Sequence, residues 1–169
     1  MKIHRITRLG LLSAIALTIF MLEAQLPPIV PIPGIKLGLA NIVTVFAVFA
    51  LGPWDGAGIL TVRVFLGAVF SGNFSTIFYS AAGGFLAILV TILLRRVLQK
   101  QQLWVAGCVG AIAHSIGQMA VAVLITGTPS LLIYLPVLIL CSIITGLFTG
   151  LCAQFLVNRG EGFWKTVFK

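Results

Sequence analysis

The sequence predicts an all-α integral membrane protein built as a bundle of six transmembrane helices. Hydrophobic residues make up 60% of the 169 residues, and charged residues make up only 8%. Soluble domains carry roughly a quarter charged residues, because a folded surface must be hydrated. The mean hydropathy is +1.17, and the apolar residues are gathered into long runs. We therefore expect the chain to fold in lipid rather than in water.

Glycine, proline and charged residues divide the apolar sequence into six candidate spans within a single membrane domain, residues 1–169. A helix needs about 20 apolar residues to cross the roughly 30 Å hydrocarbon core. The first candidate superficially resembles a signal peptide, but no small-residue cleavage site precedes Pro27, so we expect it to be retained. The six segments are approximately residues 9–26, 36–52, 56–72, 76–95, 104–126 and 131–157.

The later spans are separated by signals of different strength. The second and third are short, and the stretch Gly52-Pro53-Trp54-Asp55-Gly56 between them is a strong turn signal. Residues 71–75, between the third and fourth spans, form a softer break, where a re-entrant arrangement is an alternative. The fifth and sixth spans are long and are divided at residues 127–131.

The distribution of basic residues predicts that both ends of the chain are cytoplasmic. Cytoplasmic loops of membrane proteins carry an excess of Lys and Arg. With the N-terminus inside, the cytoplasmic segments would be residues 1–8, 52–56, 95–103 and 158–169. These segments hold nine of the eleven basic residues, whereas the external connections hold none. The chain is thus predicted to be a multi-pass protein in contact with the lipid bilayer.

Composition also excludes several classes of function. The formal net charge is +8, but the basic residues do not alternate with aromatic residues in a stripe, so we expect no nucleic acid partner. Three carboxylates in the whole chain are too few for paired acids in metal or acid–base chemistry. The motifs of P-loop ATPases, serine hydrolases and haem or iron–sulfur proteins do not occur. We therefore predict no enzyme activity, no catalytic residue, no metal and no cofactor.

Besides His114, three side chains that are charged at neutral pH fall within or beside the spans, where each costs about 2.5–3.5 kcal/mol on insertion scales. Glu23 lies late in the first span, Lys36 begins the second, and Arg63 lies about two turns into the third. One account is a buried ion pair of Glu23 with Lys36 or Arg63 that fixes helix register. The other is a site for an anionic ligand, because one acid cannot neutralise two bases. Both accounts stay open, and they can coexist.

The segment PPIVPIPGIKLGLAN, residues 27–41, is the most distinctive in the chain. Its four prolines within seven residues cannot continue a helix and favour an extended backbone. Non-helical backbone near the membrane is tolerated where it lines a cavity. The apolar character of residues 27–35 favours a lid over a pocket rather than a solvated connector. Gly38 permits close approach, and Asn41 offers an amide one turn deeper.

Polar side chains elsewhere extend the candidate pocket. His114 and Gln118 are four residues apart in the fifth span and therefore share a helical face. Hydrogen bonding between helices and contact with a ligand are both open for this pair. Asn73, Ser75 and Tyr79 lie near the external ends of the third and fourth spans and are further candidates.

Small residues at a spacing of four form stripes on two spans, as is typical of close helix packing in lipid. The first span carries Gly10, Ala14 and Thr18, and the sixth carries Ser142, Gly146 and Gly150. Either stripe can pack within the bundle. The first stripe, near the cytoplasmic end, can instead dock a partner subunit.

The segment from Pro33 to Asn41, together with Glu23, Leu26-Pro27, Arg63 and Gly83-Gly84, resembles a bacterial membrane family. That family is labelled Gx transporter or heptaprenyl diphosphate synthase component I, and the resemblance covers nearly the whole chain. In size and six-helix layout the family is similar to the S components of energy-coupling-factor (ECF) transporters. The resemblance implies an S-component-like bundle in the bacterial cytoplasmic (inner) membrane.

S components bind small molecules from outside and work with a scaffold transmembrane subunit and two ATPases, so the resemblance implies the same partners here. Their first helix carries a small-xxx-small surface for the scaffold, and Gly10, Ala14 and Thr18 match it in spacing. The synthase label conflicts with the chemistry of prenyl synthases, which hold magnesium with aspartate-rich motifs. This chain has a single aspartate, Asp55.

The resulting hypothesis is a substrate-binding subunit of an ECF-type importer for a small anionic or amphipathic molecule. The alternative is a non-catalytic membrane subunit associated with heptaprenyl diphosphate or quinone synthesis, or with extracellular electron transfer. The predicted substrate-binding residues are Glu23, Lys36, Asn41, Arg63, Asn73, His114 and Gln118.

Overall fold

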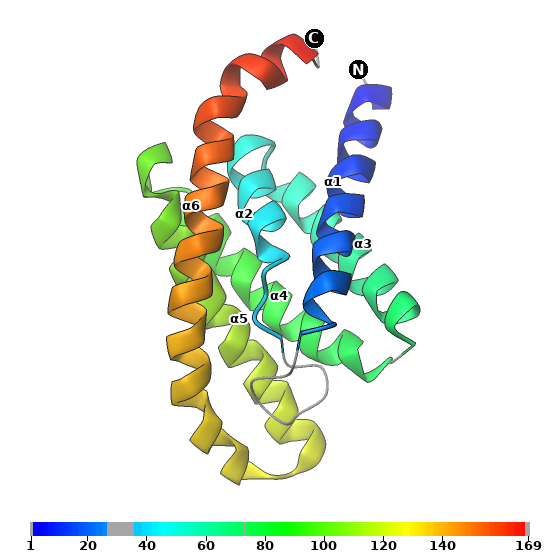
Figure 1. Ribbon diagram of the computed structural model, residues 1–169, viewed down its shortest axis with the longest axis vertical. Coiled ribbons are helices and arrows are strands. Elements are labelled where there is room, and N and C mark those ends of the chain that lie inside the picture. Colours follow the sequence, from blue (N-terminus) through cyan, green and yellow to red (C-terminus); the bar gives the residue numbers. More distant parts are fainter. Residues whose placement is uncertain (1, 27–35, 73, 168–169) are drawn as a thin grey trace.

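Helices account for all of the regular structure in the computed structural model, which describes residues 2–26, 36–72 and 74–167 (Figure 1). The predicted lid, residues 27–35, lies outside the described residues. Two short 3-10 helices, Lys100–Gln102 and Pro129–Tyr134, precede the last two α-helices. The α-helices are α1 (Lys2–Glu23), α2 (Asn41–Ala50), α3 (Pro53–Ser71), α4 (Ser75–Leu94), α5 (Leu103–Thr126) and α6 (Leu135–Val167).

Five helical segments are long and apolar enough to cross a membrane, which confirms an all-helical, multi-pass membrane protein. These segments are Ile3–Glu23, Pro53–Ser71, Ile77–Leu94, Lys100–Thr126 and Pro129–Gly160. The second predicted span, residues 36–52, contains a helix too short to count as a full span. Its helix, α2, has ten residues and therefore rises about 15 Å, roughly half of the hydrocarbon core.

The backbone around Gly38 explains why α2 is short. Gly38 has a φ of +81°, a left-handed conformation that interrupts a right-handed helix and that glycine adopts without a steric penalty. The N–H groups of Gly38 and Leu39 donate to the Glu23 carboxylate instead of to helical carbonyls. At the other end, α2 stops before Gly52 (φ +132°), and Pro53 begins α3. The turn predicted at this position is confirmed.

Helices α4, α5 and α6 pack with their backbones almost in contact. A methyl group on Gly107 of α5 would lie 2.4 Å from the carbonyl oxygen of Gly146 and 2.5 Å from the Cα of Gly150, both in α6. Ser142, on the same stripe, forms a 2.6 Å hydrogen bond with Ser115 of α5. The stripe on α6 therefore packs inside the bundle, as small residues commonly do in membrane helices.

The stripe on α1 faces the other way. Gly10, Ala14 and Thr18 are all exposed, and a methyl group on Gly10 would meet no atom within 4 Å. The opposite face of α1 carries buried residues, among them Phe20, whose ring lies 2.7 Å from the Cβ position of Gly67 in α3. The α1 stripe thus remains uncovered in the single chain. Docking of a partner on it stays a prediction.

Both ends of the chain lie at the same end of the bundle: α1 begins there and α6 ends there (Figure 1). Helix α1 ends, and α2 begins, partway along the length of the molecule (Figure 1). The non-helical residues 36–40 therefore run among the helices and place their backbone beside α1 and α5. This arrangement positions the polar cluster described next.

Candidate binding site

Six of the seven predicted binding residues gather around residues 36–40, and the seventh, Asn73, lies outside the described residues. The six come from α1, α2, α3, α5 and the segment between α1 and α2. They are connected to one another by hydrogen bonds or close contacts through that segment. The members of this polar cluster are Glu23, Lys36, Asn41, Arg63, His114 and Gln118.

Glu23, the last residue of α1, binds backbone rather than a basic side chain. It is buried, with an exposed fraction of 5%. Its Oε1 accepts the N–H of Gly38 at 2.6 Å, and its Oε2 accepts the N–H of Leu39 at 3.0 Å. Successive N–H groups beside a left-handed residue form a concave anion site. Charge-assisted hydrogen bonds of this kind are about twice as strong as neutral ones.

The account in which Glu23 pairs directly with Lys36 or Arg63 is thus not supported by a contact among the described residues, although all three charges lie in the same cluster. Among the described residues, a contact within 4.0 Å between opposite charges joins only Arg5 and Asp55. The backbone N–H groups of Gly38 and Leu39 donate to the two carboxylate oxygens of Glu23, and spacing in the sequence does not reveal these contacts. The acid fixes the segment after the prolines, rather than the register of two helices.

Arg63 of α3 is buried, with an exposed fraction of 2%. Its Nη1 donates to Oδ1 of Asn41 at 3.3 Å. Within the described part of the chain, Arg63 Nε and Asn41 Nδ2 have no hydrogen-bond partner, and neither does Oγ1 of Thr44, one turn farther along α2. An unsatisfied buried polar group costs about 1–3 kcal/mol, and more when it is charged. Arg63 and Asn41 therefore each hold a buried N–H donor without an acceptor among the described residues.

Lys36 contacts an aromatic ring and an amide. Its Nζ lies 3.5 Å from the centroid of the Phe20 ring, a cation–π geometry. Its backbone N–H donates to Oε1 of Gln118 at 3.4 Å. Phe20 was not predicted as a site residue, although it lies three residues before Glu23 and so shares its helical face. The ammonium is held beside a ring, and no carboxylate of the described residues is in ion-pair contact with it.

His114 and Gln118 face the segment and α4 from the same side of α5, as predicted. A methyl group on Gly83 of α4 would lie 2.9 Å from Cε1 of His114 and 2.8 Å from Cγ of Gln118. A methyl group on Gly38 would lie 3.1 Å from Cδ2 of His114. Two glycines thus make room for the imidazole. Nδ1 of His114 has no hydrogen-bond partner among the described residues.

The two further candidates on α4, Ser75 and Tyr79, lie apart from this cluster. Tyr79 is buried in an apolar group with Met119, Ala122 and Leu138. Ser75, at the start of α4, is exposed. Tyr79 is therefore a packing residue, and the side of the cluster nearest α4 is formed by Gly83 instead.

The chemistry of the cluster favours an anionic or acceptor-rich group. It combines one acid with two bases, so one positive charge is left over. The acid is already hydrogen-bonded, and unpaired N–H donors remain on Arg63 and Asn41. In the described part of the chain, no three His, Cys, Asp or Glu residues are grouped as metal ligands. These residues can bind such a group non-covalently.

No curated protein and no solved structure matches the chain significantly. A family model does match, and its description is heptaprenyl diphosphate synthase component I. The match runs over residues 12–156, which includes every member of the polar cluster. The chain therefore belongs to the heptaprenyl diphosphate synthase component I family.

Proposed function

We propose that this protein is the membrane-embedded substrate-binding subunit of an ECF-type importer, and that its substrate is a small anionic or amphipathic molecule. The observation that supports this most strongly is Arg63. Its guanidinium is buried, makes no ion pair with a carboxylate, and keeps Nε unpaired among the described residues. Charges at membrane depth are costly and normally serve a ligand, an ion or a partner charge.

The substrate's acidic group would complete the hydrogen bonding of the cluster. A carboxylate or phosphate oxygen accepts from guanidinium and amide N–H groups, and the free donors of Arg63 and Asn41 supply both. Lys36 adds a second positive charge near the Phe20 ring. Binding of this kind is reversible, so release into the cell requires a conformational change driven by partners.

The exposed stripe on α1 supports the dependence on partners. Gly10, Ala14 and Thr18 leave a smooth surface on which another helix backbone can approach closely. A scaffold transmembrane subunit docked there would connect this chain to two ATPases. Both termini would then be cytoplasmic, as the distribution of basic residues predicts.

The family description favours a second candidate, a non-catalytic subunit associated with heptaprenyl diphosphate or quinone synthesis. In that case the polar cluster would contact a partner or stabilise the bundle, and the purified chain would carry no metabolite. Neither candidate assigns catalysis to this chain.

Native mass spectrometry of the detergent-purified protein from its own host tests the proposal. We expect a bound anionic or amphipathic metabolite, together with a scaffold subunit and ATPases. An Arg63→Gln variant purified in parallel should lose the metabolite. An exposed-site control, Arg159→Gln on α6, should retain it. An empty protein bound to a prenyltransferase or a redox protein would exclude the importer and favour the second candidate.

A further inference from the structure

A pocket of about 490 Å³ opens at the end of the bundle where α1 begins. The start of α1, the connection from α2 to α3 and the end of α4 meet around it. Its charged lining consists of Arg5, Asp55 and Arg95, and Trp54 also lines it, with an exposed fraction of 85%. It is distinct from the polar cluster and shares no residue with it.

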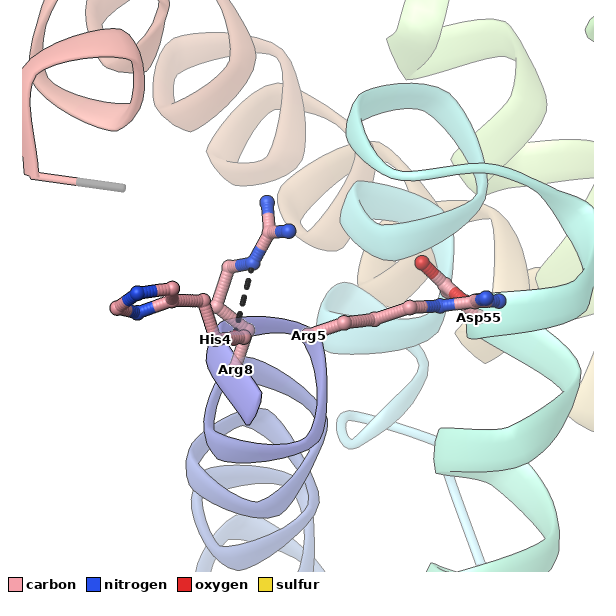
Figure 2. Close-up of polar contacts among 4 residues, drawn as sticks. All are labelled: His4, Arg5, Arg8 and Asp55. Carbon is pink, nitrogen blue, oxygen red and sulfur yellow. Dashed lines mark hydrogen bonds and ion pairs between the residues drawn. The ribbon is translucent and has the colours of Figure 1, made fainter. Parts of the chain in front are cut away.

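One arginine in this pocket is neutralised. Figure 2 shows Arg5 extending from α1 toward Asp55, in the first turn of α3, whereas the side chains of His4 and Arg8 point elsewhere. Nε and Nη2 of Arg5 both donate to Oδ1 of Asp55. This contact holds the start of α1 against α3 and leaves no surplus charge.

The second arginine of the pocket, Arg95, can contact a ligand. The backbone N–H of Arg95, just after α4, donates to the carbonyl of Thr91, but its side chain has no hydrogen bond or ion pair within the described part of the chain. Its Nη1 lies 3.9 Å from the position that a Cβ on Gly52 would occupy. The glycine therefore leaves open space beside the guanidinium. The pocket as a whole carries one positive charge that no described side chain neutralises.

The position of the pocket points to lipid. It lies where membrane helices end, and tryptophan is enriched where a protein passes from hydrocarbon to water. The exposed Trp54 therefore marks the level of the lipid headgroups. Basic pockets between helices on the cytoplasmic side bind anionic headgroups, and guanidinium groups suit phosphate because they form paired hydrogen bonds.

We propose that this pocket binds the phosphate of an anionic phospholipid headgroup, with Arg95 as the main charged contact. Asp55 positions Arg5 at one wall, and Trp54 covers the glycerol region of the lipid. The inference does not depend on the proposed substrate or on the partners of the chain.

Lipid retention measured by native mass spectrometry tests this site. The purified protein is mixed with equal amounts of phosphatidylglycerol and phosphatidylcholine, and retained lipid is counted for each variant. We expect preferential retention of one phosphatidylglycerol, and a loss of at least about ten-fold in Arg95→Gln, because that variant loses charge-assisted hydrogen bonds to the phosphate. Arg96→Gln removes the same charge from the next residue, which is exposed and does not line the pocket. It removes no contact in the pocket, so it should lower retention less than Arg95→Gln does.

Further variants separate a specific site from general attraction. Arg95→Lys should restore most of the retention, since lysine keeps the charge. Trp54→Ala alters an exposed side chain, so it should fold normally and still reduce retention. Equal losses in Arg95→Gln and Arg96→Gln would overturn the proposal in favour of diffuse attraction by this end of the bundle. Displacement of phosphatidylglycerol by excess inorganic phosphate would assign the pocket to free phosphate rather than to lipid.

Discussion

Replacing Arg63 by glutamine separates a ligand-binding role from a structural role, because the two roles predict opposite results. The Arg63 side chain is 2% exposed, and its one described side-chain hydrogen bond runs from Nη1 to Asn41 Oδ1 at 3.3 Å. Glutamine keeps an amide N–H donor and removes the positive charge. The formal charge of the cluster then falls from one positive to zero.

The expected magnitudes follow from burial. Removing one member of a buried, hydrogen-bonded charge pair costs about 2–5 kcal/mol of binding free energy, which is a loss of affinity of at least about 30-fold. Without a ligand, Arg63 has no ion-pair contact with a carboxylate in the part of the chain that the structure describes. Removing its charge relieves a desolvation cost, so the free energy of unfolding should stay unchanged or rise by about 1 kcal/mol.

Two measurements on the same samples check this prediction. Native mass spectrometry gives the fraction of protein with bound metabolite, and thermal unfolding of ligand-free protein, followed by tryptophan fluorescence in detergent, gives stability. Arg159→Gln on α6 serves as the control for a change of net charge. A variant with normal metabolite occupancy and a lowered unfolding midpoint would refute the reasoning and make Arg63 a structural residue.

The other predictions concern the end of α1, the segment between α1 and α2, the stripe on α1, and Gly107 of α5, which packs against the stripe on α6. Lys36→Ala should lower metabolite occupancy without lowering the unfolding midpoint; a change in the midpoint alone would count against a ligand role. Glu23→Gln weakens the hydrogen bonds to two backbone N–H groups and should cost about 1–3 kcal/mol of stability in denaturant titrations. Gly38→Ala, at a φ of +81°, should destabilise by about 1–2 kcal/mol, and an unchanged midpoint would refute the strain. Gly107→Ala should lower the thermal midpoint strongly because its methyl group would lie 2.4 Å from a carbonyl oxygen, whereas Gly10→Ala, with no atom within 4 Å, should not.

Much of the fold could be predicted from composition, because lipid as a solvent demands long apolar helices. The starts and ends of α4 and α5 lie within one residue of the predicted bounds. The error at α2 has a local cause. Residues 36–40 are apolar enough to be predicted as the start of a transmembrane helix. In the structure Gly38 is left-handed, and its backbone N–H donates to the carboxylate of Glu23. Hydropathy does not report such a competition.

The candidate site could be predicted to a similar degree. Charged and amide side chains in apolar segments are expected to face the interior of the bundle. This rule predicts the burial of Glu23, Arg63 and Gln118, which the structure shows. The contacts between them could not be predicted, because they depend on how residues 36–40 cross the bundle. Gly83 was visible only as part of a family resemblance, and its role in making room for His114 required the packing of α4 against α5.

The geometry of α1 has a mechanical consequence. This helix presents its stripe of small residues to the outside, and its last residue holds the N–H groups of Gly38 and Leu39. It packs on α3 through a side chain, the ring of Phe20 against Gly67, whereas α5 and α6 meet backbone to backbone at Gly107 and Gly150. A sliding or tilting of α1 would therefore pull on the backbone beside the polar cluster, while α5 and α6 stay packed together. The stripe ends at Thr18, five residues before Glu23 and therefore about 7.5 Å from it along the helix axis. A partner that moves the outer face of α1 would therefore also move the end of the helix that holds residues 38 and 39.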